Sequence, residues 1–304
     1  MPDTPRSRTW LWVILGGGAF LLFILAMFSL AFLVLHNSGE STSAMNFGEK
    51  IGVIDLDGVI LDSTTFNAQL KKFADDDSIK AIIIHVNSPG GGVAASEEIY
   101  RAVKRVRDEK KKRIVASIST VGASGAYYVS SATNKIFADS GSVVGSIGVI
   151  AEWVNYGDLM RWVKLKSEVL TVGKFKDTGD PSREMTPEER AYMQSLIDNM
   201  YGQFIHDVAV GRHTTDDKIA PLATGQVWTG EQAQPLGLID AQGGYRVALM
   251  NTARAVGIQG EPHIVRPRSD KRGIFTVLND DADDLFPNPS QLLNRSPGFY
   301  YLWK

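Results

Sequence analysis

Residues 81–92 read AIIIHVNSPGGG, a short apolar run followed by two polar residues, a proline and three glycines. A run of this length, rich in β-branched residues and ending in turn-forming residues, predicts a buried strand. The three glycines let the backbone approach a ligand closely and direct its N–H groups towards it. Beyond them, apolar residues recur at helical spacing: Ile99, Ala102, Val103 and Val106. The segment therefore predicts a strand, a glycine turn and a helix at about residues 93–111.

The same alternation of strands and helices extends along the chain in both directions. Further strands are predicted at residues 51–56, 113–118, 135–138, 143–151 and 167–172. Further helices are predicted to begin near Ser124 and to span about 156–164, 187–210 and 245–256. The helix at 187–210 has matching start and stop signals, because Thr186 and Glu189 form a capping pattern and Gly211 follows its end. This order of elements predicts an α/β fold with mainly parallel strand pairing.

The composition excludes several classes of protein. The 304 residues include 32 Lys and Arg against 34 Asp and Glu, so no charge excess favours binding to nucleic acid. The absence of cysteine excludes disulfides, thiolate metal sites and cysteine nucleophiles. The glycine turn at 90–92 matches neither the Walker loop nor the dinucleotide fingerprint. We therefore expect no nucleic-acid partner, no metal and no cofactor.

The N-terminus carries a long apolar run without charge. Residues 10–35 are numerous enough to cross a bilayer as a helix. Two arginines precede this run and Glu40 is the first charge after it, so the positive-inside rule places residues 1–9 in the cytoplasm. A cleaved signal peptide is the alternative, because small residues near 42–44 offer a suitable cleavage spacing. The run exceeds the usual apolar core of a signal peptide, which favours a retained signal anchor.

The remaining boundaries follow from changes in composition. Residues 36–50 are small and polar and predict a linker. Residues 51–262 contain the alternating pattern and predict the folded domain. Residues 263–304 predict a C-terminal extension that is weakly structured, because most of it combines aspartates and prolines without a clear period. The extension nevertheless ends in an aromatic cluster at 299–303.

Two segments offer the chemistry of acyl transfer. The glycine turn at 90–92 lies between a strand and a helix, where backbone N–H groups stabilise negative charge in an oxyanion hole or a phosphate site. Ser124 lies in the sequence GASGAYY at another strand-to-helix turn, which exposes a hydroxyl to substrate. The N–H of Gly125 would then lie beside the attacked carbonyl. Each segment alone also fits a structural role, as a tight turn or as a helix cap.

A serine nucleophile needs a base. The five histidines are poor candidates, because none comes with an aspartate in a loop that would orient its ring. A lysine serves only when neutral, which requires a dry pocket that lowers its pKa from about 10.4 by several units. The sequence GKFKD contains Lys174 and Lys176, whose side chains would project on the same side of an extended segment, so geometry leaves the choice open. A hydroxyl such as that of Ser146 could hold the neutral amine.

Four motifs, taken in order, resemble those of signal peptide peptidase A in its single-repeat form: SPGGG at 88–92, ASGAYY at 123–128, VVGSIGV at 143–149 and KFKDTGDPSREMT at 174–186. The resemblance covers roughly residues 51–256. It implies the Clp protease/crotonase-type fold, a spiral of ββα units, and a serine peptidase that uses a Ser/Lys dyad.

The resemblance also implies a role for each candidate residue. Ser124 resembles the nucleophile, and Lys176 resembles the general base. Ser146 resembles the serine that hydrogen-bonds this lysine. Gly91 resembles one oxyanion-hole residue, and the N–H of Gly125 resembles the other donor.

The resemblance further implies the setting of the enzyme. The substrates would be released signal peptides and similar extended apolar chains, and the enzyme would be a ring-shaped, octamer-like homo-oligomer. It would be held in a bacterial-type inner membrane with its catalytic domain outside the cytoplasm. An acyl-CoA enzyme of the crotonase type and an inactive membrane scaffold are the alternative functions.

Two groups of aromatic residues carry separate expectations. The cluster at 299–303 is predicted to dock in the substrate groove or at the membrane interface. Trp153, Tyr156 and Trp162 are candidates for lining the apolar groove, although core packing is the favoured interpretation.

Overall fold

The computed structural model describes residues 24–29, 49–267 and 298–303. The chain divides into two compact units, Met1–Phe47 and Gly48–Lys304. In the first unit, residues 24–29 are helical, while the rest of the predicted anchor at 10–35 and most of the predicted linker lie outside the described residues. No helix within the described ranges is both long and apolar enough to cross a membrane.

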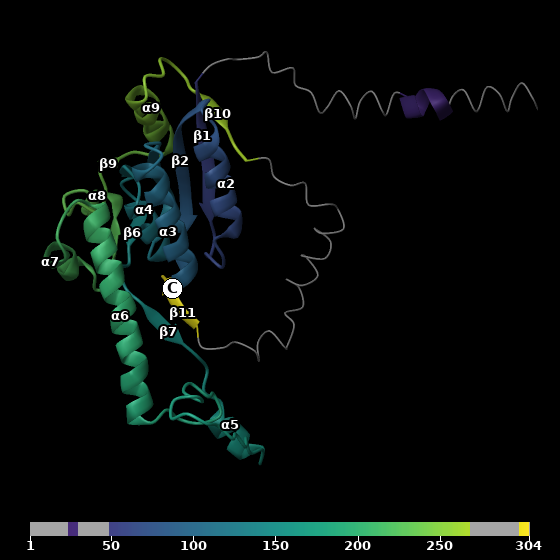
Figure 1. The fold of residues 1–304 in the computed structure, drawn as a ribbon, viewed down its shortest axis with the longest axis vertical. Helices are drawn as coiled ribbons and strands as arrows, with labels where there is room; N and C mark the ends of the chain where they lie inside the picture. The colour runs from purple at the N-terminus through teal and green to yellow at the C-terminus, as the bar shows by residue number, and fades with distance from the viewer. Residues whose placement is uncertain (1–23, 30–48, 268–297, 304) are drawn as a thin grey trace, which may run out of the picture. The chain divides into compact units, whose positions relative to one another are not determined.

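The second unit is built on an eight-stranded sheet (Figure 1). Its main path runs β10-β1-β2-β4-β5-β9, with these bounds: β10 His263–Val265, β1 Lys50–Asp57, β2 Ile79–Ser88, β4 Arg113–Ala123, β5 Lys135–Ala138 and β9 Ala241–Gln242. Strand β6 (Val143–Gly145) pairs with β4, and β8 (Val227–Thr229) pairs antiparallel with β6. The other strand pairs described in this sheet are parallel, which confirms the predicted α/β class.

Helices cover both faces of this sheet. One face packs against α2 (Thr64–Asp75), α3 (Val93–Asp108) and α4 (Gly125–Ser131), and the other packs against α9 (Tyr245–Ala255). Along β2, Ile82 and Ile84 point into the first cluster and Ile83 points into the second. A strand covered on both faces requires apolar residues at consecutive positions, which is why its sequence shows an unbroken apolar run.

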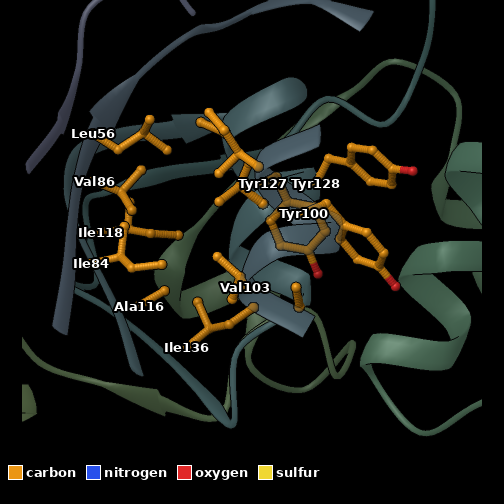
Figure 2. Packing of buried hydrophobic residues seen from close by; sticks show 14 of the residues in the cluster. Leu56, Ile84, Val86, Tyr100, Val103, Ala116, Ile118, Tyr127, Tyr128 and Ile136 are labelled. Atoms are coloured by element: carbon orange, nitrogen blue, oxygen red, sulfur yellow. The ribbon is translucent and has the colours of Figure 1, made fainter. Parts of the chain in front are cut away.

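Figure 2 shows how the larger cluster continues from the sheet into the helices. The rings of Tyr100 and Tyr128 stack with centroids 4.6 Å apart. Both hydroxyls reach Asp207, Tyr100 donating to its backbone carbonyl at 3.0 Å and Tyr128 to its carboxylate. Since Asp207 lies on α6 (Pro187–Gly211), these contacts fix that helix against the core.

Helix α6 begins as predicted. The Thr186 side chain accepts a hydrogen bond from the Glu189 N–H at 3.2 Å, and the Glu189 carboxylate accepts one from the Thr186 N–H at 2.8 Å. This reciprocal pair satisfies backbone N–H groups that a helix start leaves without partners. The short helices α7 (Asp216–Ile219), η1 (Ala220–Leu222) and α8 (Gly230–Ala233) follow α6 along the chain.

The predicted strand at 143–151 is wrong, because it is two strands, β6 and β7 (Ile150–Glu152). Gly145, the last residue of β6, and Ser146, the residue after it, both have positive φ, at 91° and 52°. Such a conformation ends a strand, and a pattern of apolar residues does not reveal it.

Residues 153–186, which we call the arm, connect β7 to α6 and contain α5 (Gly157–Trp162). In Figure 1, α5 lies away from the main sheet, near the N-terminal end of α6. The predicted strand at 167–172 is wrong: this segment is irregular, and Leu170 in it is 102% exposed. Trp162, which we assigned to the core, is 80% exposed. The arm does contain the apolar residues on which these predictions rest, but many of their side chains are exposed in the described chain.

A second sheet of three strands has the order β3-β11-β7. Strand β3 (Gly90–Gly92) is the glycine turn, and β11 (Gly298–Leu302) is part of the predicted weakly structured extension. The prediction is therefore wrong for the end of the extension, while residues 268–297 lie outside the described residues.

The core residue Ile84 provides a test of this fold. Its side chain is fully buried in the larger cluster, so Ile84→Ala should lower the free energy of unfolding by about 2–5 kcal/mol. The exposed Leu61 is the control, and Leu61→Ala should change that free energy by less than about 0.5 kcal/mol. Denaturant unfolding followed by circular dichroism measures both values, and equal effects would contradict the packing described.

Candidate active site

Ser124 lies between the end of β4 and the start of α4. Its backbone has φ 52° and ψ −117°, a conformation that is strained for a residue with a side chain. Its N–H donates to the Gly145 carbonyl at 2.7 Å, which helps to hold the turn. The hydroxyl makes no capping hydrogen bond to α4, so the alternative interpretation of Ser124 as a helix cap is not supported.

Ser146 lies beside this turn because of strand register. In the parallel pair of β4 and β6, the last residues of the two strands, Ala123 and Gly145, lie opposite each other. The residues that follow them, Ser124 and Ser146, therefore leave the two strands at neighbouring positions. Both serines have φ 52° and both line one cavity of about 570 Å³. We call this the active-site cavity; its other lining comes from residues 148–150, α6, residues 223–225 and the end of β11.

The two glycines predicted as oxyanion donors lie close to each other, next to the Ser124 turn. A Cβ atom added to Gly125 would lie 3.2 Å from the backbone nitrogen of Gly91, so the start of α4 and strand β3 are in contact. The same atom would lie 2.4 Å from the Ser96 hydroxyl, and a Cβ on Gly91 would lie 2.1 Å from the Ile60 carbonyl oxygen. Neither position has room for a side chain, which lets both backbones come close to a ligand.

Lys176 is not part of this group. It lies in an exposed turn of the arm, where its N–H donates to the Gly173 carbonyl at 3.1 Å. It is not among the described residues that line the active-site cavity. The neighbouring Lys174 forms an ion pair with Glu188 at the surface. The fold of one chain therefore brings together Ser124, Ser146, Gly91 and Gly125 but leaves the predicted base apart from them.

The turn that carries Lys176 is anchored to the start of α6. Arg183 contacts the Asp177 carboxylate at 2.9 Å and donates to the Glu189 carboxylate from two nitrogens, at 2.8 and 2.5 Å. The hydrogen bond from Arg183 lowers the pKa of Glu189 from 4.5 to about 2, and the N–H of Thr186 contributes further. Glu189 thus joins the capping of α6 to the position of the Lys176 turn.

The histidines are only partly as predicted. His85 contacts the Asp55 carboxylate at 3.2 Å and His206 contacts Asp216 at 3.3 Å, so two histidines do pair with aspartates. Neither histidine lines the active-site cavity, so neither pair supplies a base to Ser124. His36 lies outside the described residues. Among the residues described, no group of three or more His, Cys, Asp or Glu side chains is placed to hold a metal ion.

A buried serine in a strained strand-to-helix turn, next to two glycine N–H groups, has the arrangement of a serine hydrolase. Comparison with known proteins gives the family. The profile of peptidase family S49 matches residues 106–259, and that of Clp protease matches residues 50–136. The chain therefore belongs to peptidase family S49 and is a serine peptidase, which confirms the resemblance to signal peptide peptidase A.

Individual relatives agree with this assignment. The chain is 33% identical over 258 residues to "Putative protease MJ0651" of Methanocaldococcus jannaschii, an alignment that covers 80% of this chain and 82% of the relative. It is 32% identical to "Putative signal peptide peptidase SppA" of Enterococcus faecium, over 64% of this chain and 60% of the relative. It is 30% identical to "Protease 4" of Haemophilus influenzae, over 69% of this chain but only 35% of that longer protein.

Sequence reasoning missed the part of the site that α6 and the C-terminal strand supply. The cavity is lined by Tyr201 from α6 and by Leu302 and Trp303 from the end of the chain. The aromatic cluster at 299–303 was the sequence signal for this part of the site. It predicted that the chain end docks in the groove or at the membrane interface, but it did not predict which residues of the tail pair with which residues of the site.

Glu189→Gln tests how the Lys176 turn is anchored, because its effect should depend on pH. A carboxyl whose pKa is lowered by folding stabilises the fold above its unfolded pKa, and this stabilisation is lost as the pH falls from about 4.5 towards about 2. The free energies of unfolding of wild type and variant should differ most near about pH 6, and the difference should shrink below about pH 4.5 and disappear only as the pH falls towards about 2.

Acid-dependent denaturant titrations measure this difference. Glu184→Gln, which changes an exposed carboxyl in the same segment, is the matched control and should show little dependence. A difference between wild type and Glu189→Gln that stays constant with pH would contradict the role given to the Arg183 contact.

Proposed function

We propose that this peptidase cuts peptide bonds by acyl transfer, with Ser124 as the nucleophile and Lys176 as the general base. The observation that carries the proposal is the contact of the Ser124 turn with the glycines of β3. Neutral Lys176 takes the hydroxyl proton, and the Ser124 oxygen attacks the peptide carbonyl. The N–H groups of Gly91 and Gly125 stabilise the oxyanion, the amine leaves, and water hydrolyses the ester.

In this proposal Lys176 reaches Ser124 from a second copy of the chain. A general base must come within hydrogen-bond reach of the proton it takes, and Lys176 of the same chain does not line the cavity. The arm that carries Lys176 exposes several large apolar side chains: Val154, Leu159, Trp162, Leu165, Val169, Leu170 and Val172. Large apolar side chains that are exposed in one segment of a chain are typical of protein interfaces.

A homo-oligomer would cover this surface and complete the site. An arm that contacts the cavity of the next copy makes a head-to-tail interface, and repeated head-to-tail contacts close into a ring. This is the ring-shaped, octamer-like assembly that the resemblance implies. The Ser146 hydroxyl, next to Ser124, would hold the incoming amine, and the walls of the interface would exclude water and lower the lysine pKa.

The proposed substrates are extended apolar peptides, including released signal peptides. The name of the Enterococcus faecium relative supports this choice. Strands β3 and β7 lie one strand apart in the second sheet, so a chain between them must be extended to pair with both. Most of the backbone of a folded protein is already hydrogen-bonded and therefore does not offer such a strand.

We also propose that residues 10–35 anchor the enzyme in a bacterial-type inner membrane. The uncharged run and the arginines before it support an N-terminus in the cytoplasm and a catalytic unit on the other side. A site at the membrane surface would meet signal peptides where they are released. The arrangement of the whole unit as a spiral of ββα repeats likewise stays a proposal from the resemblance.

Substitution of the proposed dyad tests the mechanism. Ser124→Ala and Lys176→Ala should each lower the rate of peptide cleavage by about 10³-fold or more, because each removes a group that acts in the transition state. Lys174→Ala is the matched control and should change the rate by less than about 3-fold, because Lys174 makes an exposed ion pair with Glu188 and lies over the Phe175 ring at the surface.

Cleavage of a quenched fluorescent peptide and labelling by a fluorophosphonate measure these effects. The label should be found on Ser124 and should be absent from Ser124→Ala. An acyl-CoA enzyme or an inactive scaffold would show no such label. Equal loss of activity in Lys174→Ala and Lys176→Ala would overturn the assignment of the base.

A further inference from the structure

Ser96 lies in the first turn of α3, directly after the glycines of β3. Its side chain is fully buried, and its hydroxyl has no hydrogen-bond partner among the described residues. A serine in a helix can donate to the carbonyl one turn back, as Ser130 of α4 does to Ala126 at 2.7 Å, but Ser96 does not. A buried hydroxyl without a partner has given up its hydrogen bonds to water, so its presence here needs an explanation.

The Ser96 hydroxyl lies beside the two glycines proposed as oxyanion donors. A Cβ atom added to Gly125 would be 2.4 Å from the Ser96 oxygen and 3.2 Å from the backbone nitrogen of Gly91. This single position is therefore close to the hydroxyl, to the N–H of Gly91 and to the N–H of Gly125 itself. Side chains on a helix lean towards its N-terminus, so a serine in the first turn of α3 is directed back towards the glycines of β3.

A carbonyl oxygen already reaches this group of donors. The Tyr301 carbonyl oxygen of β11 would be 3.1 Å from the same Cβ position on Gly125. The Ser96 hydroxyl nevertheless has no partner within the described chain, so a planar carbonyl in this place leaves it free. During acyl transfer the carbonyl carbon becomes tetrahedral, and its oxygen moves and gains negative charge. A donor that is free beside the planar group is then available to the displaced, charged oxygen.

We propose that the Ser96 hydroxyl is a third donor of the oxyanion hole, and that it binds the oxyanion of the transition state rather than the carbonyl of the bound substrate. The inference rests on the proposed function, because it assumes that Ser124 attacks a carbonyl held at Gly91 and Gly125. Ser96 is then a catalytic residue that none of the four sequence motifs assigned.

The hydroxyl donates a hydrogen bond and transfers no proton. The Ser124 oxygen forms a bond to the carbonyl carbon, its proton passes to the base, and one electron pair of the carbonyl double bond moves to the carbonyl oxygen. The Ser96 hydroxyl stabilises that negative oxygen together with the two N–H groups. When the bond to the leaving nitrogen breaks, the base gives its proton to the amine, the double bond forms again, and Ser96 is released.

Close packing is the competing explanation for a serine at this position. Ser96 lies against Gly125, where α3 meets the start of α4, and only a small side chain fits there. Alanine is small enough and carries no hydroxyl that would remain unpaired. Ser96→Ala therefore preserves the packing and removes only the donor, so the two explanations predict different rates for this variant.

The test compares Ser96→Ala with a matched control, Ser117→Ala, both in the full chain. Ser117 is also fully buried, and its hydroxyl also has no partner among the described residues. It lies on β4 and faces the other side of the sheet, as Val115 does two residues before it. Cleavage of a quenched fluorescent peptide gives kcat and KM for each variant, and circular dichroism shows that both are folded.

We expect Ser96→Ala to lower kcat about 100-fold, because one donor to the oxyanion is lost while the two N–H groups remain. The KM should stay within about 3-fold of the wild type, because the hydroxyl does not contact the carbonyl of the bound substrate. Both constants of Ser117→Ala should stay within about 3-fold of the wild type, because this serine lies on the other face of the sheet.

A peptide aldehyde separates a role in the transition state from a role in substrate binding. The aldehyde adds reversibly to a serine hydroxyl and forms a tetrahedral adduct, whereas the corresponding peptide alcohol forms none. Ser96→Ala should raise the inhibition constant of the aldehyde by about the same factor by which it lowers kcat/KM. The inhibition constant of the alcohol should stay within about 3-fold of the wild-type value.

An unchanged kcat in Ser96→Ala, a loss that appears only in KM, or equal losses in Ser96→Ala and Ser117→Ala would overturn the inference. If the wild type cleaves the peptide and is labelled at Ser124 by a fluorophosphonate, such a result rejects the third donor alone. A wild type that neither cleaves any peptide nor takes the label rejects the proposed function, and the inference with it.

Discussion

The site depends on the parallel pairing of β4 with β6, which brings Ala123 opposite Gly145. Both strands leave the sheet at their next residue with positive φ, so Ser124 and Ser146 emerge side by side. The hydrogen bond from the Ser124 N–H to the Gly145 carbonyl joins the two turns. The strain at the turns is supported by a sheet that is buried on both faces, and this gives the proposed nucleophile a fixed position beside the glycines of β3.

The arm differs from this rigid centre in its physical character. It has little regular structure and it exposes apolar side chains. Within the described chain, its turn at 176 is held to α6 by Arg183 between Asp177 and Glu189 and by the stacking of Phe175 on Tyr192. In the proposed oligomer the two parts meet across an interface, so the base arrives only when a neighbour is present. A single chain would then hold a nucleophile and a substrate groove, occupied by β11, without the group that starts the reaction.

Local signals predicted most of the central fold, because strands covered on both faces and capped helices leave direct patterns, as in AIIIHV and at Thr186 with Glu189. The prediction of a strand at 167–172 was wrong. An apolar pattern shows that a segment is suited to burial, but it does not show whether the residues that bury it belong to the same chain. Motifs singled out Ser124 and Gly91, but their proximity depends on the pairing of distant strands. The position of Tyr301 opposite Gly91 depends on pairing across most of the chain, which no local pattern contains.

In the proposed enzyme, Lys176 of one copy serves Ser124 of another, and complementation between two variants tests this pairing. Chains carrying Ser124→Ala and chains carrying Lys176→Ala, each with a different tag, are co-expressed, and mixed oligomers are purified through both tags. If the dyad forms between copies around a ring, random mixing restores about a quarter of the wild-type sites, because such sites need one intact serine and one intact lysine from neighbours. Mixed oligomers that remain as inactive as either variant alone would show that the dyad does not form between copies.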